Sequence, residues 1–404
     1  MNVLLVRPRP HADTIGLQSM MICEPLELEY LAAMVQDHHQ VSLIDLIIDK
    51  KPLLYHLQQI QPQVVALTAY IAHVNVIKEY ARIIKSFDPT IHVVIGGVHA
   101  EVVPEDFFDP HIDFIVAKNP LQNFSSLLTQ MEAGTEGVLP KVITNPGTHA
   151  SPAEEFIPPV FPKRSITAHY RHRYYYIYHN PCALLKTSYG CPYTCSFCFC
   201  RQVTDGGYFE RKLTDVIEEI KGITEPEIYI VDDNFLVDPQ RVRQFCSLLE
   251  DHSIDKHFLI YGRADFIAAH EDIIARFAQV GLRAVIVGVE SPNPQELEKY
   301  NKKSSVLLNE QAIRVLAKYD VDCYATLIVG IDWTKEDFFL LQQWLQKMKL
   351  RFINLQPFTP LPGTPVYDDY QDQLLIPRDC YQQWDLANLV VQPSNISVRR
   401  YYYY

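Results

Sequence analysis

The chain has 404 residues, of which 48% are hydrophobic and 21% charged, as in an ordinary globular protein long enough for two domains. A formal net charge of -12 argues against a nucleic-acid partner, because such binders need clustered lysine and arginine. Nine cysteines are too few and too clustered for a secreted disulfide framework. With no signal-like start and no apolar run near the ~20 residues of a membrane span, a cytoplasmic protein without a transmembrane segment is expected.

Five short β-rich runs open the chain, separated by segments with helical periodicity: residues 2–6, 41–48, 64–69, 92–97 and 113–117. This alternation predicts a parallel sheet with helices on both faces, a doubly wound α/β domain over residues 1–133. Ligands bind such sheets beyond the carboxyl ends of the strands, where Thr68, Gly96, Gly97 and His99 lie. Paired glycines let a bulky ligand approach the backbone closely.

Residues 134–181 are rich in proline and tyrosine and are predicted to form a linker. Five prolines and little periodicity in residues 145–163 indicate an extended chain. The run at residues 168–181 combines tyrosine with basic side chains, which could stack on a flat ligand. We favour an amphipathic strand or loop that anchors the linker to the next domain.

Six strand–helix units fill residues 182–367, with strands predicted at residues 183–187, 227–231, 257–261, 284–289, 323–329 and 352–356. Six units without a seventh and eighth predict a partial parallel (β/α)6 barrel whose chemistry lies at the carboxyl ends of its strands. Thr334 is expected to cap the fifth helix. Residues 368–404 form a tail ending in four tyrosines. We expect these tyrosines to be the exposed start of a helix that truncation has removed, and a surface that touches lipid or a partner is the alternative.

Three cysteines, Cys191, Cys195 and Cys198, follow the first of these strands in the spacing C-x3-C-x2-C. Three thiolates from one short loop can hold three irons of a cubane iron–sulfur cluster and leave the fourth iron open. A structural zinc site is the alternative, but zinc usually takes two separated half-sites, and no second pair is evident. Cys200 is not expected to be a ligand, because a one-residue gap puts neighbouring side chains on opposite faces of an extended segment.

This cysteine loop, placed after the first strand of a partial barrel, resembles the radical S-adenosylmethionine (SAM) superfamily. The resemblance implies a [4Fe–4S] cluster on the three cysteines, whose open iron binds SAM. One electron then cleaves SAM to a 5'-deoxyadenosyl radical. Phe197 matches the superfamily position that packs near the adenine of SAM.

The resemblance also assigns polar residues at the ends of the next three strands as candidate SAM contacts: Asp232, Asp233, Asn234, Arg263, Glu290 and Ser291. The first three occupy the position that binds the amino group of SAM, and carboxylates suit an ammonium group. Arg263 could meet the SAM carboxylate or a substrate anion. Glu290 and Ser291 stand where relatives hydrogen-bond the ribose. Helix capping and rim salt bridges are the competing interpretation of the carboxylates.

The first domain resembles the cobalamin-binding domain that precedes the radical domain in one large class of the superfamily. One strand ends in Asp, another in Thr, and the element GGVHAEVVPEDF follows. The resemblance makes Thr68, Gly96, Gly97 and His99 the cobalamin contacts. The turn that usually reads Gly-Glu-Gly-Glu is AKNP here, at residues 117–120, so a scaffold without cobalamin is the alternative.

The class implies an enzyme that takes electrons from a ferredoxin or flavodoxin and methylates an unactivated carbon of a small molecule or lipid with cobalamin. Radical ring closure or rearrangement, as in the anaerobic porphyrin-ester cyclase branch, is the alternative that the sequence leaves open. A tRNA methylthiotransferase would need extra cluster cysteines and a basic RNA module, and neither is present. A non-catalytic cobalamin- or zinc-binding module would leave the rim carboxylates unexplained.

Overall fold

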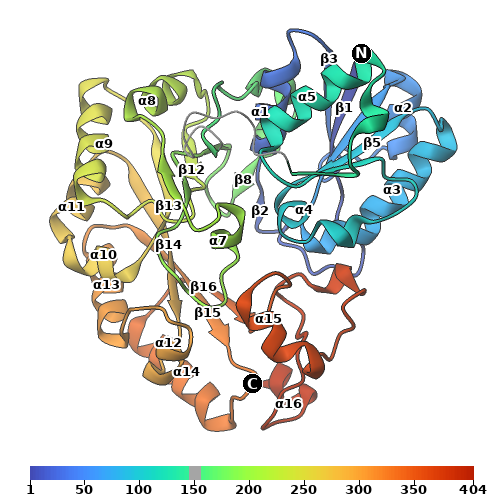
Figure 1. Ribbon diagram of the computed structural model, residues 1–404. Helices are drawn as coiled ribbons and strands as arrows, with labels where there is room; N and C mark the ends of the chain where they lie inside the picture. Colours follow the sequence, from blue (N-terminus) through green and yellow to red (C-terminus); the bar gives the residue numbers. More distant parts are fainter. Residues whose placement is uncertain (145–155) are drawn as a thin grey trace. The chain divides into compact units, whose positions relative to one another are not determined.

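The computed structural model describes residues 1–144 and 156–404 (Figure 1). The chain divides into two compact units, residues 1–178 with 379–385 and residues 179–378 with 386–404. Residues 145–155, within the predicted linker, lie outside the described part, so the expected extended conformation is not described there. No described helix is long and apolar enough to cross a membrane.

The centre of the first unit is a six-stranded parallel sheet in the order β3-β1-β4-β5-β6-β7. Its strands are β1 (Asn2–Arg7), β3 (Gln40–Asp45), β4 (Val64–Thr68), β5 (His92–Gly96), β6 (Phe114–Val116) and β7 (Val142–Ile143). The order reverses at β1, as in flavodoxin-like doubly wound sheets, which confirms the predicted fold class. The edge strand β7 was not predicted, because two residues are too short to show a periodic pattern.

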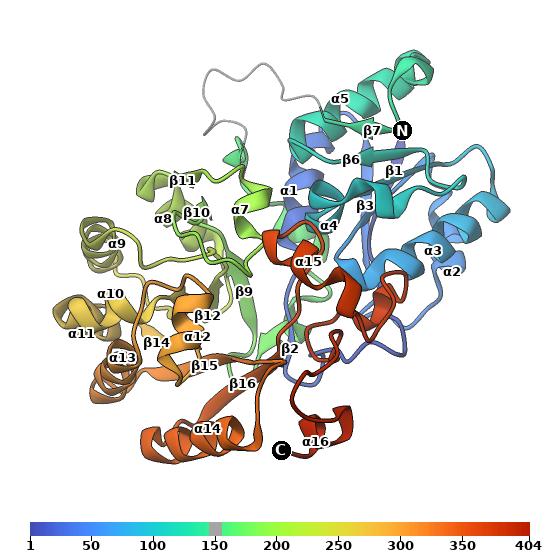
Figure 2. The same cartoon turned by 60° about the horizontal axis from the view of Figure 1, so that its bottom comes forward.

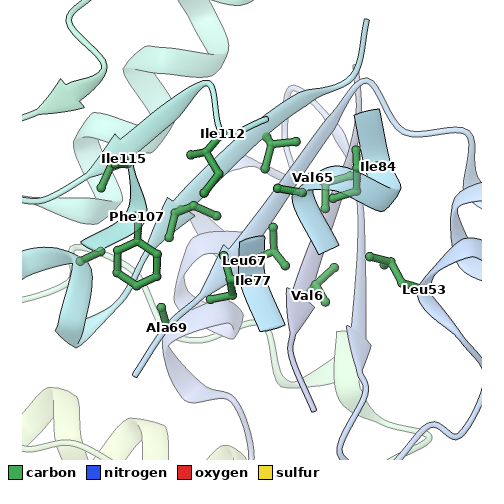
Figure 3. Packing of buried hydrophobic residues seen from close by; sticks show 14 of the residues in the cluster. Val6, Leu53, Val65, Leu67, Ala69, Ile77, Ile84, Phe107, Ile112 and Ile115 are labelled. Carbon is green, nitrogen blue, oxygen red and sulfur yellow. The ribbon is translucent and has the colours of Figure 1, made fainter. Parts of the chain in front are cut away.

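Helices cover both faces of this sheet, as Figure 1 shows. They are α1 (Leu26–Val35), α2 (Leu53–Ile60), α3 (Val74–Phe87), α4 (Val98–Val102) and α5 (Pro120–Ala133). Val6 and Leu67 pack with Ile77 and Ile84 of α3 on one face (Figure 3). Alternate residues of the same strands turn to the other face and pack against α1 and α5. Near-continuous apolar strands therefore reflect burial on both sides.

Most of the tyrosine-rich run packs on the first unit. Its His179 belongs to the second unit, where Nδ1 lies 2.7 Å from Glu227 Oε2 of a barrel strand, so the expected anchor to the barrel is made by this residue. Strand β8 (Tyr175–Tyr176) pairs antiparallel with β2 (Met21–Ile22). Tyr170 and Tyr174 are buried beside Ile48. The Tyr174 hydroxyl lies 3.2 Å from Asp45 Oδ2, and a buried phenol needs such a polar partner.

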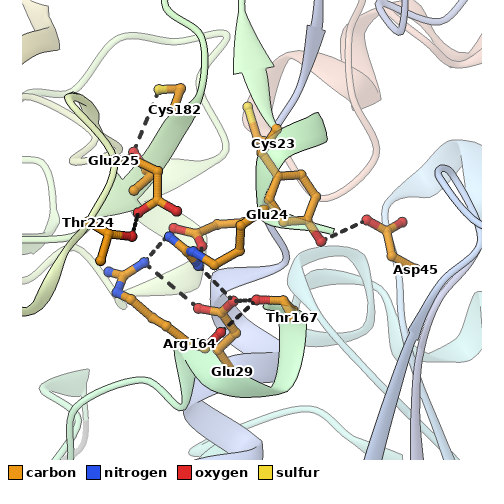
Figure 4. Close-up of polar contacts among 12 residues, drawn as sticks. Cys23, Glu24, Glu29, Asp45, Arg164, Thr167, Cys182, Thr224 and Glu225 are labelled. Carbon is orange, nitrogen blue, oxygen red and sulfur yellow. Dashed lines mark hydrogen bonds and ion pairs between the residues drawn. The ribbon is translucent and has the colours of Figure 1, made fainter. Parts of the chain in front are cut away.

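A buried ionic cluster joins residues 164–171, which lead into the tyrosine-rich run, to α1 and the residues just before it (Figure 4). Glu24, immediately before α1, accepts hydrogen bonds from Arg164 and from Arg171, the latter at 2.6 Å. Glu29 of α1 accepts one from Thr167 Oγ1. Both carboxyl groups are almost fully buried, and burial together with the charge of Glu24 raises the pKa of Glu29 to about 8.

The second unit is built on a six-stranded parallel sheet in the order β9-β12-β13-β14-β15-β16. Its strands are β9 (Cys182–Leu185), β12 (Glu227–Ile230), β13 (His257–Gly262), β14 (Leu282–Glu290), β15 (Asp322–Val329) and β16 (Phe352–Pro357). The six strands are the six predicted from the sequence. They confirm the partial barrel.

Helices follow each strand of this sheet and lie along its outer side (Figure 2). They are α8 (Leu213–Gly222), α9 (Pro239–Asp251), α10 (Ala264–Ala269), α11 (Glu271–Gln279), α12 (Pro294–Lys299), α13 (Val306–Lys318) and α14 (Lys335–Met348), followed by α15 (Pro365–Tyr370) and α16 (Val398–Tyr403). Thr334 caps α14 in a reciprocal capping box with Asp337, as predicted. In α16 Tyr401 is buried, whereas the next three tyrosines are exposed.

Candidate functional site

The three cysteines lie in one loop, residues 191–199, called the cysteine loop below. A short antiparallel pair frames it, β10 (Ser188–Gly190) before the loop and β11 (Tyr208–Glu210) after it. Gly190 has φ 79°, and a Cβ at this position would lie 2.1 Å from the Gly207 carbonyl oxygen. Only glycine therefore lets the two strands close at the point where the loop leaves the barrel.

The thiols of Cys191, Cys195 and Cys198 are free and partly exposed, and they lie close enough to influence one another. Burial raises the pKa of Cys191, and charge on the other two thiols raises it further. Burial also raises the pKa of Cys195, against the pull of the Lys302 and Arg263 cations. Within the described residues, no three His, Cys, Asp or Glu side chains converge on a single metal ion. A cubane spreads its thiolates over separate irons, so it does not require three sulfurs to meet at one ion.

Cys200 lies beside Cys198, which differs from the reasoning that set them on opposite faces. The chain does not stay extended here, because Cys200 begins the short helix α7 (Cys200–Val203). A hydrogen bond from the Cys200 thiol lowers the pKa of Cys198. The same contact, together with burial, raises the pKa of Cys200 well above its usual range.

The three polar residues after β12 have different surroundings. Asp232 is buried and accepts hydrogen bonds from Thr187 N at 2.6 Å and Ser188 Oγ at 2.7 Å, and also from Thr187 Oγ1. These contacts fix the end of β9, where Asp232 is predicted to lie near SAM. Asp233 accepts from Gly190 N at 2.9 Å and so supports the cysteine loop. Asn234 is buried, and its Oδ1 has no hydrogen-bond partner in the described part of the chain.

Arg263, at the end of β13, is held by several partners. Its guanidinium donates to both carboxylate oxygens of Asp265 and, at 2.8 Å, to the Lys302 carbonyl. It also lies 3.8 Å from the centre of the Tyr193 ring, a cation–π contact with the cysteine loop. Arg263 therefore joins β13 to the loop, whichever ligand it also meets.

Glu290 ends β14 with φ 60°, where the register with β15 shifts. Its Oε1 lies 2.6 Å from Lys302 Nζ, and both side chains are buried. Burial opposes the charge of Lys302, but Glu290 and Cys195 outweigh it and raise the pKa of the ammonium group. Sequence reasoning missed Lys302, whose only local signal is a lysine pair after α12.

Ser291 is buried next to Glu290, and its hydroxyl donates to Glu296 while accepting from Asn293 N at 3.0 Å. Glu296 also accepts from the Trp333 indole. Ser291 therefore takes part in a buried hydrogen-bond network, and its ribose contact stays a prediction. Phe197 packs edge-to-face on Tyr300 with ring centres 5.6 Å apart.

In the first unit, the carboxyl ends of β4 and β5 bring the four predicted contacts together. Thr68 Oγ1 donates to Glu27 at 3.3 Å, and His99 Nε2 pairs with Asp106 at 2.7 Å. Gly97 has φ 99°, and a Cβ there would lie 2.7 Å from Ala69 N, so this glycine is required by close backbone packing. His99 is itself buried and is paired with the Asp106 carboxylate.

Comparison with known families assigns both units. Residues 13–123 match the B12 binding domain, and residues 185–345 match the radical SAM superfamily. The chain therefore carries a B12-binding domain followed by a radical SAM domain. These domains imply a [4Fe–4S] cluster and SAM for the second unit and cobalamin for the first.

Two curated proteins resemble the chain over nearly its whole length. The hopanoid C-3 methylase of Methylococcus capsulatus is 26% identical over 100% of this chain and 78% of its own length. The anaerobic magnesium-protoporphyrin IX monomethyl ester cyclase of Cereibacter sphaeroides is 22% identical, over 98% of this chain and 68% of its own.

Two solved structures share the fold. One is the radical SAM methyltransferase TsrM from Kitasatospora setae, with a TM-score of 0.69 and 18% identity over 92% of this chain and 78% of that one. The other is the cobalamin-dependent SAM radical enzyme OxsB, with a TM-score of 0.68 and 17% identity over 91% of this chain. The chain spans only 55% of the length of OxsB.

The residues present fit these three groups. Three mutually interacting thiols beside the buried cations Arg263 and Lys302 suit a cluster, because the cations offset thiolate charge. The unpartnered Asn234 Oδ1 is an acceptor suited to the ammonium of SAM. At Gly96 a Cβ would meet only the Val116 carbonyl, at 3.9 Å, so a flat ligand such as a corrin can lie against the backbone there.

Proposed function

We propose that this chain is a cobalamin-dependent radical SAM methyltransferase acting on an unactivated carbon of a small molecule or lipid. The observation that carries the proposal is the cysteine loop, which leaves the first barrel strand beside Arg263 and the Glu290–Lys302 pair. The B12-binding domain ahead of the barrel supports methyl transfer as the outcome.

In this proposal Cys191, Cys195 and Cys198 hold the cluster, and Asn234 and Glu290 orient SAM. The cluster supplies the electron that cleaves SAM to a 5'-deoxyadenosyl radical, and cobalamin supplies the methyl group. Asp233 and Gly190 keep the cysteine loop closed against the barrel. The electron comes from a ferredoxin or flavodoxin, and the thiols need the reducing cytoplasm to stay reduced.

The relatives name two substrate classes, a hopanoid and a magnesium porphyrin ester. Methyl transfer to a polycyclic lipid is the first candidate, because the hopanoid methylase matches the whole chain at the higher identity. Radical ring closure is the second candidate, since the cyclase also matches nearly the whole chain.

The test uses anaerobically reconstituted protein with cobalamin, SAM, a reductant and one of two probes, a hopanoid or magnesium-protoporphyrin IX monomethyl ester. Methyl transfer predicts 5'-deoxyadenosine, S-adenosylhomocysteine and a hopanoid heavier by one methylene. Formation of 5'-deoxyadenosine and a cyclised porphyrin without S-adenosylhomocysteine would establish the second candidate instead. If no 5'-deoxyadenosine forms, either with each probe or without any probe, the proposal of radical chemistry is wrong.

The cluster ligands are tested separately by iron and sulfide content. Alanine at Cys191, Cys195 or Cys198 is expected to lower cluster content several-fold, because each removes one of three ligands. Cys200→Ala is the matched control, a cysteine of the same segment that should leave the content near four irons per chain, the count of one such cluster. Equal losses in all four variants would contradict the assignment.

A further inference from the structure

The cysteine loop rests on residues 299–303, which connect α12 to α13 and are called the brace segment below. Ser196 N donates to the Tyr300 carbonyl at 3.1 Å, and Ser196 Oγ donates to the Lys299 carbonyl at 3.4 Å. Asn301 Nδ2 donates to the Thr194 carbonyl at 2.8 Å and to Thr194 Oγ1 at 3.0 Å. Four hydrogen bonds thus join two segments that are about a hundred residues apart in the sequence.

A buried aromatic contact reinforces these bonds. Tyr300 is only 3% exposed, its ring meets Phe197 of the cysteine loop edge-to-face, and it stacks on Phe358 with ring centres 6.2 Å apart. Such pairs contribute beyond the area they bury. The contacts fall on Thr194, Ser196 and Phe197, which alternate with Cys195 and Cys198 along the loop.

The brace segment also carries Lys302, the partner of Glu290. Its main chain accepts a hydrogen bond from Arg263, whose guanidinium covers Tyr193. The cysteine loop, Glu290 and Arg263 are therefore all attached to the same five residues.

The backbone of the brace segment is unusual. Asn301 and Lys303 have φ 50° and 51°, in the left-handed region. Asparagine adopts this backbone region readily, whereas for lysine the same conformation raises the energy of the folded chain. Strained backbone persists when surrounding contacts determine it, and it clusters at functional sites.

We infer that the brace segment positions the cysteine loop for cluster binding, with Asn301 as its positioning residue. Asn301 touches neither sulfur nor iron. It holds the Thr194 peptide and hydroxyl, and so sets the path of the chain between Cys191 and Cys195. The inference rests on the proposed cluster at the three cysteines.

The test compares two variants that tolerate the left-handed backbone. Asn301→Asp keeps the shape but cannot donate to Thr194, and Asn301→Gly removes both hydrogen bonds without backbone strain. Lys303→Gly is the matched control in the same segment and backbone region, with an exposed side chain. The measurement is the rate at which reconstituted protein releases iron to a chelator, with the melting of the apoprotein recorded alongside.

Both Asn301 variants are expected to release iron roughly three- to tenfold faster than the parent chain, as the loss of one or two modest hydrogen bonds implies. Apoprotein melting and Lys303→Gly should stay near the parent values. Asn301 variants with the parent rate would overturn the inference while leaving the cluster intact. A parent chain that binds no iron would overturn both the inference and the proposed function.

Discussion

Glu290 and Lys302 are each ordinary in the sequence and unusual in the structure. Glu290 has a left-handed backbone at a register shift, and its carboxylate is buried against the Lys302 ammonium. A buried carboxylate needs a counter-charge, because moving an unpaired charge out of water costs free energy. Lys302 supplies this counter-charge at the position where the ribose of SAM is proposed to bind.

Lys302→Met is expected to destabilise the second unit, because it leaves the Glu290 carboxylate buried without a partner. Removing one member of a buried pair costs about 3 kcal/mol. For a unit of this size, that lowers Tm by roughly 6–12 °C.

Calorimetry of the apoprotein checks the value, with Lys303→Met, at the exposed neighbouring position, as the control. Adding Glu290→Gln to Lys302→Met should recover part of the loss. Equal Tm values for the two single variants would contradict a stabilising role for the pair.

Among the elements, α1 and the segment at residues 164–174 depend on each other. Glu24 stands at the start of the helix, where a carboxylate is favoured by the helix dipole, and it binds both Arg164 and Arg171. Tyr170 and Tyr174 of the segment bury their rings near Ile48. The ionic cluster therefore fixes a segment that forms little regular structure of its own.

Glu24→Gln is expected to loosen this segment, because an amide of the same size replaces two charge-assisted hydrogen bonds with weaker ones. Bonds to charged groups are worth about 1.5–3 kcal/mol, so amide exchange of residues 164–174 should become about tenfold faster or more. Hydrogen exchange with mass spectrometry measures this. Glu79→Gln, on the exposed side of α3, serves as the reference substitution. Unchanged exchange in residues 164–174 would show that aromatic packing alone holds the segment.

At the scale of the whole molecule, each unit has its own sheet and core, and the predicted groups are divided between them. The proposed cobalamin contacts come from β4, β5 and the turns that follow. The proposed cluster ligands and SAM contacts come from the cysteine loop and from the ends of β12, β13 and β14.

Replacing Cys191, Cys195 and Cys198 together by alanine is therefore expected to abolish the cluster and leave cobalamin binding unchanged. Cobalamin retained per chain after gel filtration, read by absorbance, is the measurement. Gly97→Ala is the complementary variant, since its Cβ would lie 2.7 Å from Ala69 N, and it should lower cobalamin retention while iron content stays at the parent value. Joint loss of both groups in the triple cysteine variant would refute this division.

The sequence by itself determined the class of protein. Strand and helix periodicity and the C-x3-C-x2-C spacing are local patterns, and they indicated both sheets, the partial barrel and the cysteine loop. The local pattern was wrong at Cys200, where the chain begins a helix instead of staying extended, and it did not reveal that the tyrosine run pairs with β2.

Only the tertiary structure decided which polar side chains are engaged and with which partner. Asp232 accepts hydrogen bonds from Thr187 and Ser188. Ser291 donates a hydrogen bond to Glu296, and Glu290 forms an ion pair with Lys302. Hydrogen bonds and ion pairs depend on distances of a few ångströms between segments far apart in the chain. The spacing of residues along one segment carries no information about those distances.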